Sequence, residues 1–219
     1  MKKLLIPKSV FDQIVFSVLE TPEGHETGVT LFGAGLEGTA KSGHGCVVLA
    51  IAGPGKRATH QPAHYSGDDG HANEIYEALR SAMPGIRWSG ELHVHPQGMT
   101  WLSGGDRRTV KQILTGDDDT LHPQEFIAGV MQRRNGTVDI YPFCFTRECL
   151  EGNGMELLIV DSDAPVVHQA RLKGIQNDRS GIRTKPEGSR TAVAQAPRHR
   201  WLRQWRERLG KYGRKVRHR

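Results

Sequence analysis

The sequence contains little cysteine, and its few thiols are not arranged in pairs. Its 219 residues include three cysteines, Cys46, Cys144 and Cys149, with no C-x-x-C spacing among them. An odd number of scattered cysteines argues against a disulfide framework and favours a reducing compartment. We interpret all three as small apolar residues of a core, although Cys144 and Cys149 could also join a metal site.

Long apolar runs are also missing, because Gly, Asp, Lys or Arg interrupts every hydrophobic stretch. None approaches the ~18 uninterrupted apolar residues of a membrane-spanning helix. The opening residues MKKLLI are basic and then apolar, but Pro7 and Lys8 end this run before the ~7–15 apolar residues of a signal peptide. We therefore expect no transmembrane segment, no export signal and a cytoplasmic location.

Charge is unevenly distributed along the chain. The net charge of +6 combines −7 over residues 1–167 with +13 over residues 168–219. The 37% of apolar residues can form one well-buried core, whereas the sequence after Leu172 is polar and rich in Gly, Ser, Pro and Arg. We predict one domain over residues 1–167, a flexible linker over 168–199 and a basic tail over 200–219.

The basic tail has the pattern of an amphipathic helix. Its large apolar residues recur every three or four positions, at Trp201, Trp205, Leu209, Tyr212 and Val216, among Arg and Lys. Such a helix can dock on an acidic protein, a nucleic acid or an anionic membrane surface. Alternatively, the aromatic stripe packs on the domain while the charges stay in solvent.

Within the predicted domain, the spacing of apolar residues alternates between that of helices and that of strands. Asn135 and Gly136 favour a tight hairpin turn between two strands. A polar connection rich in His and Gly, residues 53–70, is expected near a working surface. The pattern indicates helices over 9–19, 73–83 and 103–114, strands beginning at residues 27, 46 and 86, and strands over 126–132, 138–145 and 155–160. This succession predicts a mixed α/β fold.

The strand that begins at Ile86 ends in L-H-V-H. Since side chains alternate between the two faces of a strand, His93 and His95 point the same way and can bind one ion between their imidazoles. Asp106, in the first turn of the next predicted helix, can bring a carboxylate back over the strand end. Two nitrogens and one oxygen leave a fourth tetrahedral position open, as in catalytic rather than structural zinc sites.

The segment L-H-V-H-P-Q-G-M-T-W-L-S-G-G-D resembles the signature of the JAMM (JAB/MPN) metalloproteases, which is H-x-H-P followed by Ser, two residues and Asp. The family also carries an upstream Glu in a context similar to E-x-G-x-x-x-x-G, which E-T-G-V-T-L-F-G supplies from Glu26 onward. G-P-G from Gly53 and W-S-G-E-L-H-V-H-P from Trp88 look most like the bacterial JAB branch. The resemblance covers roughly residues 4–160.

This resemblance implies a JAB/MPN-like, cytidine-deaminase-like fold, with a curved, mainly antiparallel sheet flanked by helices. It implies one zinc ion per chain, held by His93, His95 and Asp106. Glu26 would be the general base, and Ser103 would donate a hydrogen bond to the developing oxyanion. The implied activity is cleavage after the C-terminal tail of a ubiquitin-like protein, in deconjugation or precursor processing. Conjugation-system enzymes are further expected partners.

Each candidate residue also has an alternative role. Ser103 and Asp106 form an S-x-x-D box that can cap a helix without any metal. Glu91 lies two residues before His93, faces the same way, and competes with Glu26 for the role of base or ligand. A second cluster of histidines, His60, His64 and His71, is more typical of solvated residues in a polar loop than of a metal site.

Two other functions remain compatible with the sequence. The first is a metallopeptidase that acts on another peptide or on a small amide. The second is a binding module of the MPN type without catalytic activity, against which the complete set of candidate ligands argues.

Overall fold

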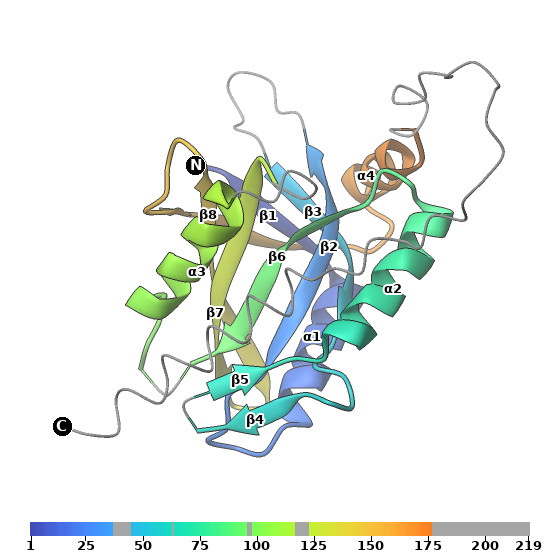
Figure 1. Cartoon of the computed structure of the whole chain (residues 1–219). Coiled ribbons are helices and arrows are strands. Elements are labelled where there is room, and N and C mark those ends of the chain that lie inside the picture. The colour runs from blue at the N-terminus through green and yellow to red at the C-terminus, as the bar shows by residue number, and fades with distance from the viewer. Residues whose placement is uncertain (37–44, 63, 96–97, 117–122, 177–219) are drawn as a thin grey trace, which may run out of the picture.

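The computed structural model describes residues 1–36, 45–62, 64–95, 98–116 and 123–176 (Figure 1). Helices and strands are interleaved along this part of the chain, as expected of a mixed α/β fold. In chain order they are β1 (Lys3–Pro7), α1 (Lys8–Leu19), β2 (Gly28–Leu36), β3 (Gly45–Ala52), β4 (Thr59–Gln61), β5 (His64–Ser66), α2 (Asp69–Ala82), β6 (Arg87–Val94), α3 (Gly104–Thr115), β7 (Glu125–Arg134), β8 (Thr137–Thr146), β9 (Asn153–Gly154), β10 (Glu156–Val160) and α4 (Pro165–Gln176).

The large sheet has the strand order β10-β1-β3-β2-β6-β7-β8-β9, and β4 and β5 form a separate hairpin. The pairs β2–β3, β2–β6, β7–β8 and β8–β9 are antiparallel. The pairs β1–β10, β1–β3 and β6–β7 are parallel. The expected mixed α/β fold with a mainly antiparallel sheet is therefore confirmed.

One short segment connects the two ends of this sheet. Residues 153–154 pair with β8 at one edge, and residues 156–160 pair with β1 at the other. Between them, the Met155 amide donates a hydrogen bond to the Pro142 carbonyl at 2.9 Å. The sheet is thus curved until its two edges nearly meet.

Helix α1 packs on the face around which the sheet curves. Its apolar spacing places Val10, Ile14 and Val18 in the core, where they join one cluster with residues of β1, β2, β3, β6, β7 and β8. A single helix can contact strands from across the sheet because the sheet bends around it. This packing confirms the helix predicted over residues 9–19.

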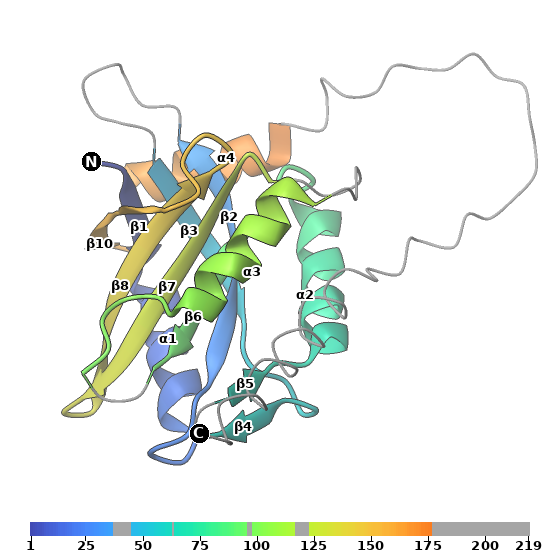
Figure 2. The same cartoon turned by 60° about the vertical axis from the view of Figure 1, so that its left-hand side comes forward.

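Helices α2, α3 and α4 cover the opposite face of the sheet, and Figure 2 shows α3 in front of it. Val110 and Leu114 of α3 pack on Phe126, Ala128 and Val130 of β7. Separate clusters hold α4 against β1, β2 and β3, and α2 against β2 and β3. The sheet is therefore the middle layer between α1 and the other three helices.

Most predicted elements are present within a few residues of their expected ends, including the hairpin turn, where Asn135 and Gly136 have φ angles of 47° and 76°. The elements that were not foreseen are β1, the β4–β5 hairpin, β9 and α4. The basic and apolar start of the chain forms β1, with Leu4 and Ile6 fully buried. The polar connection over residues 53–70 contains the β4–β5 hairpin.

The predicted domain boundary after residue 167 is wrong, because it falls inside α4. Val167 and Ala170 of this helix are fully buried against Val47 and Ala34. Their burial extends the domain through at least Gln176. The rest of the predicted linker and the predicted tail helix over 200–219 lie outside the described residues. Within the described part of the chain, no helix is long and apolar enough to cross a membrane.

Candidate metal centre

The centre begins at the C-terminal end of β6. Gly90 of this strand has a φ of +158°, and an added Cβ would lie 1.9 Å from the Ile127 carbonyl oxygen of β7. Beyond Gly90, Glu91 pairs with Ala128 and His93 with Val130, and both partners pack toward α3. Directly opposed residues share a face of a sheet, so Glu91 and His93 also face α3.

The N-terminus of α3 supplies the third side chain. Ser103 is the N-cap residue, and its Oγ accepts a hydrogen bond from the Asp106 amide at 3.2 Å. Asp106 Oδ2 in return accepts a hydrogen bond from the Ser103 amide at 2.7 Å. This reciprocal capping box holds the Asp106 carboxylate at the start of the helix, next to the end of β6.

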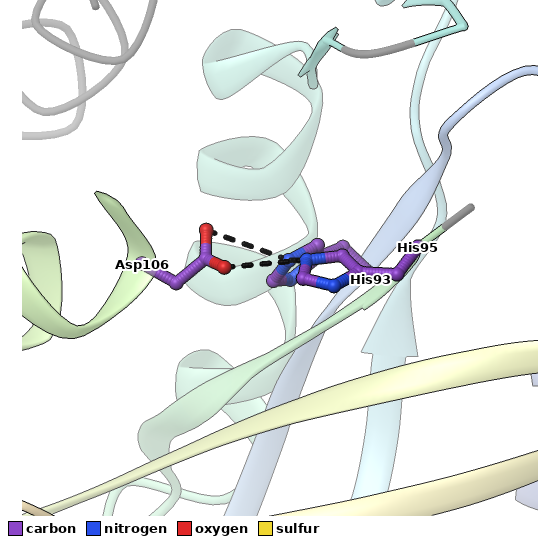
Figure 3. Close-up of side chains that lie close together, drawn as sticks. All are labelled: His93, His95 and Asp106. Atoms are coloured by element: carbon purple, nitrogen blue, oxygen red, sulfur yellow. Dashed lines mark hydrogen bonds and ion pairs between the residues drawn. The ribbon is translucent and has the colours of Figure 1, made fainter. Parts of the chain in front are cut away.

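The side chains of His93, His95 and Asp106 converge on one point (Figure 3). The two Nε2 atoms are 2.7 Å apart. Asp106 Oδ2 lies 3.2 Å from Nε2 of His95, and Oδ1 lies 3.6 Å from Nε2 of His93. One donor atom from each residue lies within 4.8 Å of the other two. Among the described residues, this is the one group of three or more His, Cys, Asp or Glu side chains with such spacing.

Mutual electrostatic interactions shift the pKa values at this centre. Burial alone would lower the pKa of His93, but its hydrogen bond with Asp106 and the charge of that carboxylate raise the pKa overall. Burial alone would raise the pKa of Asp106, but hydrogen bonds with His93 and His95 and the charge of His93 hold it well below its ordinary value. The carboxylate therefore stays ionised and faces two imidazole nitrogens.

This donor set suits a metal ion. Two imidazole nitrogens and one carboxylate oxygen are ligands that divalent transition metals accept. Without an ion, two Nε2 atoms and an ionised carboxylate face one another in a partly buried space, and at least one of the nitrogens must carry a proton to bond to the other groups. A cation would satisfy all three groups, so His93, His95 and Asp106 can hold a metal.

The group formed by His93, His95 and Asp106 is called the metal group below. Glu26 lies beside it, two residues before the start of β2. Gly28 pairs with His93 in antiparallel register, and the Val94 amide donates to the Thr27 carbonyl at 2.7 Å. One step further along this register, Glu26 is opposite His95. Glu26 and His95 are nearly 70 residues apart in the sequence, and the pairing of β2 with β6 brings them together.

The β4–β5 hairpin fixes the backbone around Glu26. The Glu26 amide donates to the Gln61 carbonyl at 2.9 Å, and His60 Nδ1 lies 3.1 Å from the Glu26 carbonyl oxygen. The Tyr65 hydroxyl donates to the Gly28 carbonyl at 3.0 Å. These contacts hold the chain on both sides of Thr27.

The environment of Glu26 raises its pKa to about 7. Burial contributes most, the positive charge of His93 opposes it, and the negative charge of Asp106 adds to it. A carboxyl group with this pKa can both take up and release a proton near neutral pH. A bound cation would favour the ionised form and lower this pKa.

A cavity of about 490 Å³ opens beside the centre. Glu26 and His95 line it together with the loop at Glu23 and the ends of β7 and β8. A ligand in this cavity would contact both Glu26 and His95.

The alternative candidates named from the sequence are Glu91, the S-x-x-D box and the second cluster of histidines. Glu91 is buried behind His93, where its negative charge helps raise the pKa of that histidine. The predicted cap and the predicted ligand coincide in Asp106, since the capping box and the metal group share this residue. His60, His64 and His71 are not part of the metal group. Instead, His60 contacts the backbone of Glu26, a role for which the sequence held no signal.

The three cysteines are free thiols. Cys46 and Cys144 are buried and Cys149 is partly buried, as expected of small core residues. Burial raises the pKa of both the Cys46 and the Cys144 thiol. Within the described residues, no cysteine joins a metal-binding group.

Fold and site together define a mixed α/β protein with a His–His–Asp group that can hold a metal ion. No family model matches the sequence, and no curated protein does. The fold has a distant likeness to the solution structure of protein DSY2949 from Desulfitobacterium hafniense. That match has 14% identity and a TM-score of 0.49, and it covers 72% of this chain and 93% of the other.

Proposed function

We propose that this protein is a zinc-dependent peptidase of the JAMM (JAB/MPN) type. The observation that supports it best is the convergence of His93, His95 and Asp106 beside Glu26, next to a cavity that Glu26 and His95 line. These residues stand in the order and spacing of the JAMM signature. A JAB/MPN-like fold is part of the same proposal.

The metal in this proposal is zinc, one ion per chain, held by His93, His95 and Asp106. When bound, it would supply a Lewis acid that polarises a carbonyl group and makes a water molecule more acidic. The capping box orients one of the three ligands before any metal binds, which reduces the conformational entropy lost on binding.

Glu26 is the proposed general base. It would take a proton from the attacking water and pass that proton to the leaving amine. Its backbone is held by the β4–β5 hairpin, so that the carboxylate stays at the cavity wall. Ser103 Oγ already accepts from the Asp106 amide, and its single hydroxyl proton can therefore be donated to a developing oxyanion.

The proposed substrate is the C-terminal tail of a ubiquitin-like protein, cleaved in deconjugation or in precursor processing. An extended tail ending in Gly has little side-chain bulk, so that its last carbonyl group could approach the proposed metal closely. Conjugation-system enzymes are the proposed partners in the cell.

The test uses the zinc-loaded full chain and two substrates, a ubiquitin-like protein with a short C-terminal extension and the same protein joined to a lysine side chain. Mass spectrometry should detect cleavage after the tail, lost on treatment with a chelator and restored by zinc. Cleavage of other peptides alone would favour a general metallopeptidase. Metal binding without any cleavage would favour the non-catalytic binding module.

A further inference from the structure

Arg133, near the end of β7, is a second polar feature of the cavity that contains Glu26 and His95. Its Nε and Nη2 atoms are buried, and neither has a hydrogen-bond partner. A buried donor without an acceptor costs free energy, and more so when it is charged. A guanidinium kept in this state at the wall of a cavity indicates that its acceptor comes from a ligand.

The other charged groups of the cavity do not meet this need. Arg134 bonds to Asp139 at 3.3 Å, so that these two charges neutralise each other. Glu23, also in the cavity wall, opposes the lowering of the Arg133 pKa that burial causes. It lies too far from the guanidinium to form an ion pair, since no contact within 4.0 Å joins the two.

The two unpartnered atoms also have a specific geometry. Nε and Nη2 form one edge of the planar guanidinium, and two parallel N–H bonds from this edge match the two oxygens of a carboxylate. Both atoms are shielded from bulk water, and such shielding strengthens a charge-assisted bond to a ligand that reaches them. Because both atoms are buried, a ligand reaches this edge only when the long side chain turns it toward the cavity that Arg133 lines.

We infer that Arg133 binds a carboxylate of the substrate. The inference rests on the proposed function, because the same cavity serves cleavage. It narrows the substrate class to peptides that carry a carboxylate within a few residues of the scissile bond. Two sources have this chemistry, namely the free C-terminus of a short extension and an acidic side chain.

The experiment separates recognition from cleavage. Fluorescent peptides that contain Gly-Gly followed by a short extension are prepared with a free C-terminus, with an amidated C-terminus, and with a Glu or a Gln in the extension. Their binding to the full-length Glu26→Gln protein is measured by fluorescence anisotropy, in the parent and with Arg133→Gln, Arg133→Lys or Arg134→Gln added. The wild-type chain is assayed for hydrolysis of the same peptides.

We expect at least tenfold tighter binding of one carboxylate-bearing peptide than of its neutral counterpart, which corresponds to about 1.4 kcal/mol. Arg133→Gln should abolish this preference and leave the affinity for the neutral peptide unchanged. Arg133→Lys should restore part of it, and Arg134→Gln should retain it. The free C-terminus and the Glu peptide distinguish the two sources. Melting temperatures check that each variant is folded.

Equal binding of charged and neutral peptides, or a preference that survives Arg133→Gln, would overturn the inference. These results do not depend on turnover. If the wild-type chain hydrolyses no peptide but the preference is lost in Arg133→Gln, the proposed function fails and the carboxylate site stands. If it hydrolyses charged and neutral peptides equally well and binds them equally, the function stands and the carboxylate site fails.

Discussion

At the scale of single residues, the centre contains three candidate metal ligands, and the residues around them have other roles. His93 and His95 reach the same point because they are two residues apart on a strand, and Asp106 reaches it because the capping box holds its carboxylate. Replacing any one of the three removes a ligand without removing the others.

His93→Ala and Asp106→Asn should each lower zinc affinity by at least about 100-fold, since loss of a ligand costs more than loss of an outer-shell partner. Asn keeps the oxygen that caps α3, so this variant tests the charge and not the helix. Zinc titration with a competing chelator measures the effect. His60→Ala is the control, with wild-type affinity expected, and full affinity in both ligand variants would contradict the assignment.

Glu26→Gln should leave zinc bound and lower turnover by the ~10²- to 10⁴-fold attributed to acid–base catalysis. Gln keeps the size of Glu but cannot accept the proton from water. Glu91→Gln is the matched control, because Glu91 lies two residues before His93 on β6 and faces the same way. If Glu91→Gln were inactive and Glu26→Gln active in the same assay, the base would be misassigned.

At the scale of elements, capping side chains explain where α2 and α3 begin. Asp68 is the N-cap of α2, and its side chain accepts a hydrogen bond from the His71 amide. It also pairs with Arg57 at 2.8 Å, across the β4–β5 hairpin. Hydrogen bonding from Arg57 is the main cause that lowers the Asp68 pKa to about 2, with burial opposing it.

Asp68→Asn should therefore destabilise the protein at pH 7 by on the order of 1 kcal/mol, because the cap remains while the charge is lost. The folded-state pKa lies below the ordinary value of 3.8. The contribution is thus present above pH ~4 and disappears as the pH falls toward ~2. Denaturant unfolding of both proteins between pH 7 and pH 3 should show the difference shrinking, and a constant difference would exclude the ion pair as its source.

At the scale of the whole molecule, the domain ends later than the sequence predicted. Helix α4 buries Val167 and Ala170 against the sheet, and the Gly85 amide donates to the Gly174 carbonyl of this helix. The segment was interpreted as linker because the sequence after Leu172 is polar and rich in Gly, Ser, Pro and Arg. Tertiary contacts stabilise it instead, as they do most helices in proteins.

A chain that ends at residue 176 should therefore be more stable than one that ends at residue 167, by roughly 2 kcal/mol or more, because the shorter chain leaves apolar surface of β1 and β3 exposed. Chemical denaturation of the two truncated chains under identical conditions measures the difference. Equal unfolding free energies would mean that α4 contributes nothing to the domain.

Much of this protein could be predicted from its sequence. The helical spacing of Val10, Ile14 and Val18, the Asn135–Gly136 turn and the alternation of His93 and His95 depend on backbone geometry within a few residues. Such local rules require no contact between distant segments, and together with the S-x-x-D spacing they were sufficient to predict most elements and the three members of the metal group.

Other features depended on contacts between distant segments. Glu26 lies opposite His95 because β2 pairs with β6 in one register, which no local pattern encodes. His60 supports Glu26 because a short polar hairpin folds against it, and Arg133 enters the same cavity because β7 runs parallel to β6. The closure of the sheet and the burial of α4 likewise arise from packing. Local sequence determined which residues could bind a metal, and tertiary structure decided what surrounds them, since burial and strand register exist only in the folded chain.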